Sequence, residues 1–205
     1  MPSAWHNTSG GSGGGYELQL SLPGTSMTGW TTESGTWSSD GTVISKTDTV
    51  AGDQSTWYDT PIDYSEIFIC QVDIRFPSSG QVAGDYYGGV AFTNGTSAAT
   101  TNGPRWRMAE VSSAKTRFEI LDGTLSVQNT QTISAFSEDV WYTVRMGVSG
   151  GVISVRIDDE HICTTRWSDT TDASTATNEH DQVGFIATNG LVDFRNLSVW
   201  TMVQP

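Results

Sequence analysis

Glycine-containing turn pairs divide the chain into short segments, and this pattern constrains the fold most strongly. Four such pairs stand between runs in which apolar and polar residues alternate: Asp40-Gly41, Asp122-Gly123, Gly150-Gly151 and Asn189-Gly190. These dipeptides favour tight hairpin turns, and a period of two is typical of strands with one buried face. No segment has the apolar spacing and caps of an amphipathic helix. The sequence therefore predicts an all-β fold of antiparallel sheets packed as a sandwich.

The expected strands extend over most of the chain. They lie in the segments 16–22, 29–46, 66–76, 86–92, 105–111, 116–127, 140–167 and 183–200. Segment 140–167 is expected to hold three strands, with a second turn at Asp158-Asp159. We interpret 183–200 as a hairpin of two neighbouring strands with Phe194 turned inward. Arg195 and Asn196 would then hold the closing strand in place and would not contact a substrate.

The chain divides into an arm and one domain. Residues 1–15, around "NTSGGSGGG", form a Gly/Ser-rich N-terminal arm, a composition typical of flexible segments. Residues 16–205 show no internal repeat and are long enough to bury one core, so they are expected to form a single β-sandwich domain. We expect the arm to act in assembly, with Trp5 as its anchor.

Charge and hydropathy exclude several classes of protein. The formal net charge is −13, from 23 acidic residues against 10 basic ones, which argues against binding to nucleic-acid phosphates. No apolar run reaches 18 residues, so no membrane span is expected. The first twenty residues lack the basic and apolar regions of a signal peptide.

The two cysteines, Cys70 and Cys163, lie on different expected strands. Cys70 shares an alternating face with Phe68 and Val72, which favours a buried free thiol that packs as a small apolar side chain. A Cys70–Cys163 disulfide is the alternative.

Four motifs carry a resemblance to a known family. They are "GWTTESGTWSSDGTVIS", the Gly-rich "YYGGVAF", and the pair "VWYTVRMGVSGGVISVRIDDEHI" and "VGFIATNGLVDFRNLSVW". Over residues 28–200 their order resembles the concanavalin A-like lectin/glucanase jelly rolls, laminin G-like domains included. It is most similar to the 3-keto-disaccharide hydrolase-like domain family. The resemblance implies a jelly roll, while the motifs are mostly turn glycines and core aromatics that leave function open.

No catalytic set is expected. Glucanases of this fold place Glu-x-Asp-x-Glu on one strand, whereas Glu119 and Asp122 here are offset by three and face opposite sides. The acidic stretch 157–160 is interpreted as solvated turn carboxylates. The family usually has an Arg after its Gly-rich strand, where this chain has Thr93. The sequence therefore predicts a protein that is not an enzyme.

No cofactor and no zinc-type metal site are expected either. The three histidines lie apart, at His6, His161 and His180. The loop "SDTTDASTATNEHD" could gather oxygen ligands for calcium, with a plain acidic loop as the favoured alternative. Its candidate ligands are Asp169, Asp172, Glu179 and Asp181.

A ligand-binding face is expected on the outside of one sheet. If Tyr86, Val90 and Phe92 point inward, Tyr87, Gly89 and Ala91 point outward, and the two small residues would leave a groove beside Tyr87. The same alternation turns Trp106, Met108, Phe118 and Ile120 inward and leaves the polar side chains between them outside. The candidate ligand-binding residues are Tyr87, Arg107, Arg117 and Glu119. The alternative is a Glu119–Arg cross-strand pair that only keeps the sheet soluble.

Tryptophans are expected in two settings. Trp30, Trp37, Trp141 and Trp200 are assigned to the core. At least one of the others that border polar loops is expected to be exposed, namely Trp57, Trp106 or Trp167.

Three functions are compatible with these features. The first is a non-catalytic virion surface protein of the decoration or fibre type, located on the virion or outside the cell. It would be a homo-oligomer that contacts other assembly proteins through its arm and adheres to cell-surface glycans. The alternative is a carbohydrate-binding module of a secreted protein. A glycoside hydrolase is the third and least favoured function.

Overall fold

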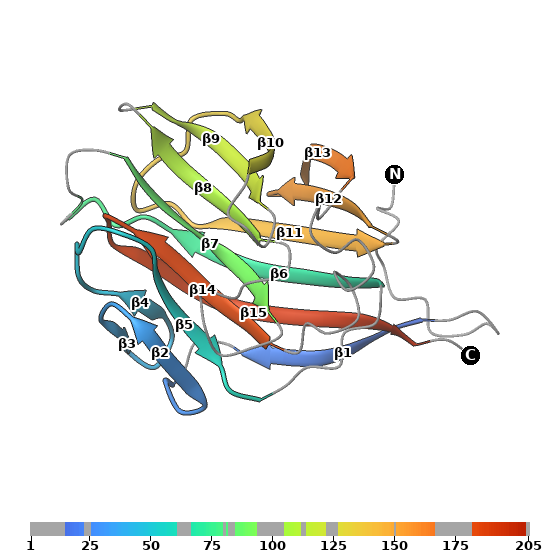
Figure 1. Cartoon of the computed structure of the whole chain (residues 1–205), viewed down its shortest axis with the longest axis horizontal. Helices are drawn as coiled ribbons and strands as arrows, with labels where there is room; N and C mark the ends of the chain where they lie inside the picture. Colours follow the sequence, from blue (N-terminus) through green and yellow to red (C-terminus); the bar gives the residue numbers. More distant parts are fainter. Residues whose placement is uncertain are drawn as a thin grey trace.

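The chain forms two antiparallel β-sheets that pack face to face (Figure 1). The computed structural model describes residues 15–22, 26–60, 67–79, 81, 85–93, 105–111, 114–121, 127–149, 151–166 and 182–203. Within these ranges it has fifteen strands and no helix, so none of the described residues forms a helix able to cross a membrane. The predicted all-β antiparallel sandwich is confirmed.

The first sheet has eight strands in the order β13-β12-β11-β6-β15-β4-β3, with β1 paired to the other part of β15. Their bounds are β1 Gly15–Leu22, β3 Trp37–Ser39, β4 Ile44–Lys46, β6 Ile67–Arg75, β11 Tyr142–Ser149, β12 Val152–Ile157, β13 Glu160–Arg166 and β15 Val192–Val203. The second sheet has seven strands in the order β10-β9-β8-β7-β14-β5-β2. Their bounds are β2 Trp30–Ser34, β5 Gln54–Tyr58, β7 Tyr86–Thr93, β8 Arg105–Val111, β9 Ala114–Leu121, β10 Val127–Thr132 and β14 Gln182–Thr188.

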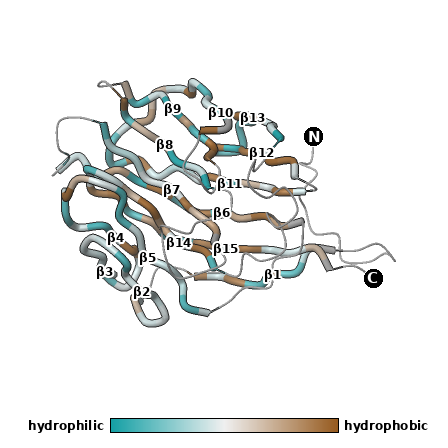
Figure 2. Tube along the Cα trace, in the orientation of Figure 1, coloured by the Kyte–Doolittle hydropathy of each residue, from teal (hydrophilic) through white to brown (hydrophobic). Residues whose placement is uncertain are grey.

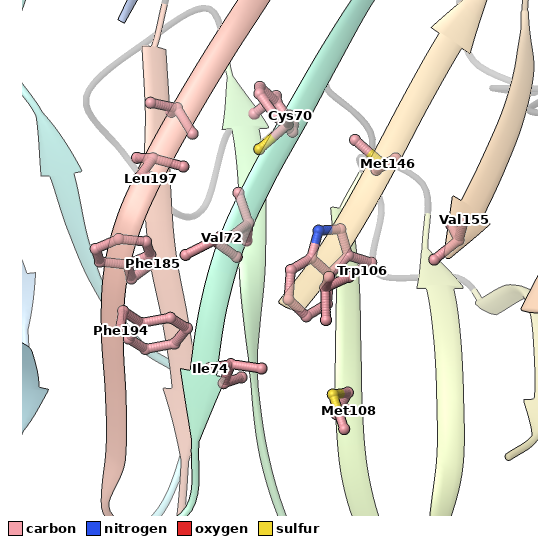
Figure 3. Packing of buried hydrophobic residues seen from close by; sticks show 14 of the residues in the cluster. Cys70, Val72, Ile74, Trp106, Met108, Met146, Val155, Phe185, Phe194 and Leu197 are labelled. Carbon is pink, nitrogen blue, oxygen red and sulfur yellow. The ribbon is translucent and has the colours of Figure 1, made fainter. Parts of the chain in front are cut away.

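The predicted alternation decides which side chains enter the core. Figure 2 shows apolar residues concentrated along the central strands β6, β14 and β15. Figure 3 shows Val72 and Ile74 of β6 and Trp106 and Met108 of β8 pointing into the space between the sheets, and all four are buried. The inward assignments of Trp106, Met108, Phe118, Ile120 and Phe194 are confirmed.

The last two strands do not form the hairpin that we predicted. β14 pairs with β5 and β7 in the seven-stranded sheet, whereas β15 pairs with β6, β4 and β1 in the eight-stranded sheet. The Asn189-Gly190 turn therefore carries the chain from one sheet to the other. Asn189 has a φ of 55°, but the φ of Gly190 is not positive, so the two residues do not form the type I′ turn of a two-residue hairpin.

Gln81 holds this crossing in place. Its Nε2 donates to the carbonyl of Leu191 at 2.8 Å, and its Oε1 accepts from the Leu191 amide at 3.2 Å. A Cβ on Gly190 would lie 2.2 Å from the same Oε1, so a larger residue there would displace the Gln81 amide. The crossing brings two inward aromatic side chains together. Phe185 and Phe194 stack with their ring centroids 4.2 Å apart and their planes at 6° to each other (Figure 3).

The structural role predicted for Arg195 and Asn196 is confirmed. Both side chains donate to the same oxygen of Asp73 on β6, Arg195 Nε at 3.2 Å and Asn196 Nδ2 at 2.8 Å. The pairing of β15 with β6 shifts register between Arg195 and Ser198, and Asn196 has a φ of 56° there. The two residues therefore fasten a β-bulge in the last strand.

Two of the four tryptophans assigned to the core are placed differently. Trp30 and Trp37 are buried as predicted, but Trp141 and Trp200 are only half-buried. Two guanidinium groups lie over Trp141, with Arg75 at 4.7 Å and Arg195 at 4.1 Å from the centroid of its ring. The sequence motifs predict a buried side chain for Trp141. An indole can also lie on the outside of a sheet when cations stack on it, as they do here.

Both cysteines are free and buried, so the disulfide alternative is not formed. Burial raises the pKa of both thiols, to about 11 for Cys163. Thiols in such surroundings are inert and pack as apolar groups.

The remaining turn predictions agree with the strand pairing. β3 and β4 pair around Asp40-Gly41, β9 pairs with β10, and β11, β12 and β13 form consecutive antiparallel pairs. Asp158 and Asp159 have φ values of 48° and 66°, and Asp158 accepts the Thr143 amide at 2.8 Å. The acidic stretch 157–160 is therefore a turn.

Several predictions fall outside the described residues. These are the fourteen N-terminal residues of the arm with Trp5 and His6, the Asp122-Gly123 turn, and the loop 167–181 with Trp167, Asp169, Asp172, Glu179, His180 and Asp181.

We expect Phe194→Ala to lower the free energy of unfolding by about 3–5 kcal/mol, because a fully buried ring would be replaced by a cavity beside Phe185. Urea unfolding measures this loss. The control is Val140→Ala, whose side chain is 44% exposed and whose loss should stay below about 0.5 kcal/mol. A similar small loss for Phe194→Ala would contradict the role given to the aromatic stack.

Candidate functional site

The four candidate residues meet on the outer face of the seven-stranded sheet. Arg107 of β8 lies opposite Glu119 of β9, and its guanidinium carbon is 4.3 Å from the centroid of the Tyr87 ring on β7. Arg107 Nε donates to Glu119 Oε2 at 2.5 Å, and Arg117 Nη1 donates to Glu119 Oε1 at 3.4 Å. The structure thus brings the residues together, while their part in binding stays a prediction.

The carboxylate of Glu119 is the best-protected group of this cluster. Its side chain is only 4% exposed, against 22% for Arg107 and 42% for Arg117. A buried carboxylate needs partners that offset its lost hydration, and each arginine satisfies a different oxygen. The alternative was a cross-strand pair that only keeps the sheet soluble. The arrangement differs from such a surface pair, because the Glu119 side chain is almost fully buried.

Tyr87 is fixed at both ends. Its ring lies under the Arg107 guanidinium, and its hydroxyl donates to Asp53 Oδ1 just before β5. Burial raises the pKa of the Tyr87 phenol well above its ordinary value, and the hydrogen bond to Asp53 adds to the shift. The hydroxyl therefore remains protonated at neutral pH and keeps donating to Asp53.

Asp53 is a site residue that the sequence reasoning missed. It stands in "AGDQST", which indicates an ordinary turn before a strand. Thr188 of β14 donates to the carbonyl of the neighbouring Gly52 at 2.7 Å and so ties this turn to the sheet. Only the sheet order, which puts β14 between β5 and β7, reveals that the turn lies near Tyr87.

The same face carries a second polar group around Glu33 of β2. Glu33 Oε2 accepts from Ser55 Oγ at 3.0 Å and from Trp57 Nε1 at 3.1 Å. Trp57 has no exposed surface and packs with Ala91 and Ile186 in a small apolar cluster. Trp106 is also buried, so the exposed tryptophan expected among residues 57, 106 and 167 is neither of the two that the structure describes.

The predicted groove beside Tyr87 is filled. Ala91 is fully buried against Trp57, and a Cβ on Gly89 would lie 1.8 Å from the backbone oxygen of Trp106. Arg105, which was assigned to the outside, lies on that face but is only 4% exposed. The small residues therefore serve close packing of the strands, and the accessible polar groups belong to Arg107, Arg117 and Tyr87.

No group of three or more potential metal ligands occurs among the residues that the structure describes. The cluster around Tyr87 instead combines two arginine guanidinium groups with a carboxylate and a protonated phenol. Such groups can donate to and accept from a polar ligand in fixed directions, which is the chemistry of recognition.

The fold and this cluster define a jelly-roll domain with a polar site on the outside of one sheet. Residues 17–200 match the 3-keto-alpha-glucoside-1,2-lyase-like domain, and the chain belongs to this family. The resemblance noted in the sequence is thereby confirmed. No curated protein matches the sequence.

Solved structures share the fold at low sequence identity. The carbohydrate binding module CBM66 from Bacillus subtilis is 16% identical with a TM-score of 0.58, over 82% of this chain and 93% of that one. The Emp47p carbohydrate recognition domain is 14% identical with a TM-score of 0.65, over 96% and 100%. The VIP36 exoplasmic/lumenal domain in its Ca2+/Man-bound form is 12% identical with a TM-score of 0.66, over 92% and 98%.

We expect Arg107→Ala to lower the free energy of unfolding by about 1.5–3 kcal/mol, since it leaves a buried carboxylate with one distant partner. Arg117→Ala should cost less than about 1 kcal/mol, because its guanidinium is largely solvated. Urea unfolding of both variants at neutral pH measures the difference. Equal losses would mean that Glu119 is not held mainly by Arg107.

Proposed function

We propose that this chain is a carbohydrate-binding domain that holds sugar on the outer face of its seven-stranded sheet. The observation that carries the proposal is the fixed cluster of Tyr87, Arg107, Arg117 and Glu119. Sugar hydroxyls both donate and accept, so a site that selects them needs donors and acceptors held in set directions. Glu119 provides the acceptor that aligns the arginines, and their remaining N–H groups would face the ligand.

The likeness to solved structures supports binding as the general role. CBM66 and Emp47p are described as a carbohydrate binding module and a carbohydrate recognition domain, and both align over more than four fifths of this chain. These relatives favour the binding-module alternative over the virion-surface hypothesis. The virion role, the assembly function of the arm, the homo-oligomer and the location outside the cell stay predictions.

We expect a screen of neutral oligosaccharides to give at least one ligand whose affinity depends on Arg107. Arg107→Lys keeps the charge but loses the planar fork that contacts both Glu119 and Tyr87, so the Kd should rise about tenfold or more. Calorimetric titration measures the change.

The matched control is Arg166→Lys, at an exposed position on β13 of the other sheet, where the Kd should not change. Urea unfolding of each variant verifies that the fold is retained. The proposal fails if no oligosaccharide binds, or if both lysine variants bind as the original chain does.

A lyase is the second candidate, because the family description names a 3-keto-alpha-glucoside-1,2-lyase-like domain. Elimination would move the C2 proton, acidified by the neighbouring ketone, to a base while the C1–O bond breaks and its oxygen takes a proton. Asp53 and Glu119 are the carboxylates at the site, and Tyr87 is the phenolic donor. Release of the leaving alcohol from a 3-keto-glucoside, lost in Asp53→Asn, would favour this function over binding alone.

A further inference from the structure

Two arginines face each other on the outside of the eight-stranded sheet. β11 and β12 are neighbouring strands (Figure 1), and their register pairs Arg145 directly with Arg156. Like charges in this position repel one another and destabilise the pairing. The chain has a net charge of −13 and only eight arginines, so the acidic surface offers many positions where an arginine would meet less repulsion. An anion between the two guanidinium groups would remove the conflict.

A hollow lies beside this pair. It is shallow and partly open to solvent, with room below the surface for about one water molecule, and it is lined by Ile69, Arg145, Gly147, Ser154 and Arg156. Ile69, Gly147 and Ser154 form one row across β6, β11 and β12, next to the row of the arginines. Gly147 has no side chain to fill its place, so the hollow has a low floor with a hydroxyl on one side and an apolar side chain on the other.

The groups already in contact with the arginines leave their charge largely uncompensated. Arg145 donates twice to the neutral Gln71 Oε1, at 3.0 and 2.7 Å, and Arg156 donates to the backbone carbonyl of Asp159 at 2.7 Å. Among the described residues, their only ion pair is Arg145 with Asp159, at 3.6 Å and with an Asp159 side chain that is 81% exposed. This carboxylate is well solvated and can give way to a ligand.

An apolar strip leads away from the hollow on the same face. Trp200 of β15 lies opposite Ile69, and Leu18 of β1 lies opposite Trp200. Trp200 is half-buried and Leu18 is 50% exposed. An indole with an accessible surface next to a pair of cations can pack against the C–H face of a sugar ring whose charged group reaches the arginines.

We propose that this hollow is a second binding site, specific for a sugar that carries a carboxylate, that is, a uronic acid residue. The carboxylate would take the place of Asp159 beside Arg145 Nη1 and would also accept from Arg156, one oxygen for each guanidinium group. The ring would lie over Gly147 and extend towards Trp200, whose indole is half-buried. The site lies on the sheet opposite to the Tyr87 cluster, so it does not depend on the function proposed there.

Titration with trigalacturonate, followed by calorimetry, tests this site, with maltotriose as the neutral ligand of equal length. Trigalacturonate should bind, and the double variant Arg145→Gln, Arg156→Gln should weaken it at least tenfold. The matched control is Arg166→Gln, which removes one exposed charge from β13 and should change the Kd less than twofold. Trp200→Ala should also weaken trigalacturonate, and it leaves both arginines in place.

Three results would overturn the proposal. The first is that trigalacturonate does not bind, and the second is that the double variant and Arg166→Gln lose the same affinity for it. The third is that acetate binds as tightly as trigalacturonate, which would make the hollow a plain anion site. Urea unfolding verifies that each variant is folded. The outcome is separable from that at the Tyr87 cluster, because Arg107→Lys should leave trigalacturonate binding unchanged.

Discussion

The stacked rings of Phe185 and Phe194 are the contact on which the arrangement of the two sheets depends. Phe185 belongs to β14, in the interior of the seven-stranded sheet, and Phe194 belongs to β15, in the interior of the other. Trp30 stacks on Phe185 with ring centroids 4.8 Å apart, and Trp37 lies 6.3 Å from Phe194. Because only three residues separate β14 from β15, the crossing sets the two sheets at the distance at which these rings meet.

This crossing also explains how much of the fold could be predicted. Period-two alternation and turn dipeptides depend on local chemistry, so the strands and the hairpins at Asp40-Gly41 and Asp158-Asp159 follow from the sequence. Pairing between distant strands does not, and the Asn189-Gly190 turn was assigned to a hairpin for that reason. An Asn-Gly pair permits a hairpin turn without imposing one, since glycine accepts negative and positive φ alike and only Asn189 has a positive φ here.

The burial of residues on the outer faces of the sheets could not be predicted from the sequence either. Alternation placed Tyr87, Arg107, Arg117 and Glu119 on one face, and the register brings them into contact. Nothing in the pattern indicated that β14 is buried at every position, or that Trp57 is hidden on the outside of a two-layer fold. Asp53 and Glu33 escaped notice because their partners lie on strands distant in sequence.

The two outer faces differ in their chemistry. On the seven-stranded sheet Glu119 is satisfied by two arginines, and Glu33 and Asp53 accept from neutral donors. On the eight-stranded sheet one group of arginines is equally well satisfied, with Arg75 on Asp193 and Arg195 on Asp73 beside Trp141. Arg145 and Arg156 differ from these, since they face each other over an open hollow. A neutral ligand suits the first face, and an anionic one suits the hollow.

Mapping of a bound neutral oligosaccharide by NMR tests the central claim most directly. Amide chemical shifts would be followed as the sugar is added, with the resonances assigned to individual residues. We expect the shifts to concentrate on β7, β8 and β9 around Tyr87, Arg107 and Glu119. Shifts confined to other elements, with these three strands unaffected at saturation, would contradict a sugar-binding role for the outer face of the seven-stranded sheet.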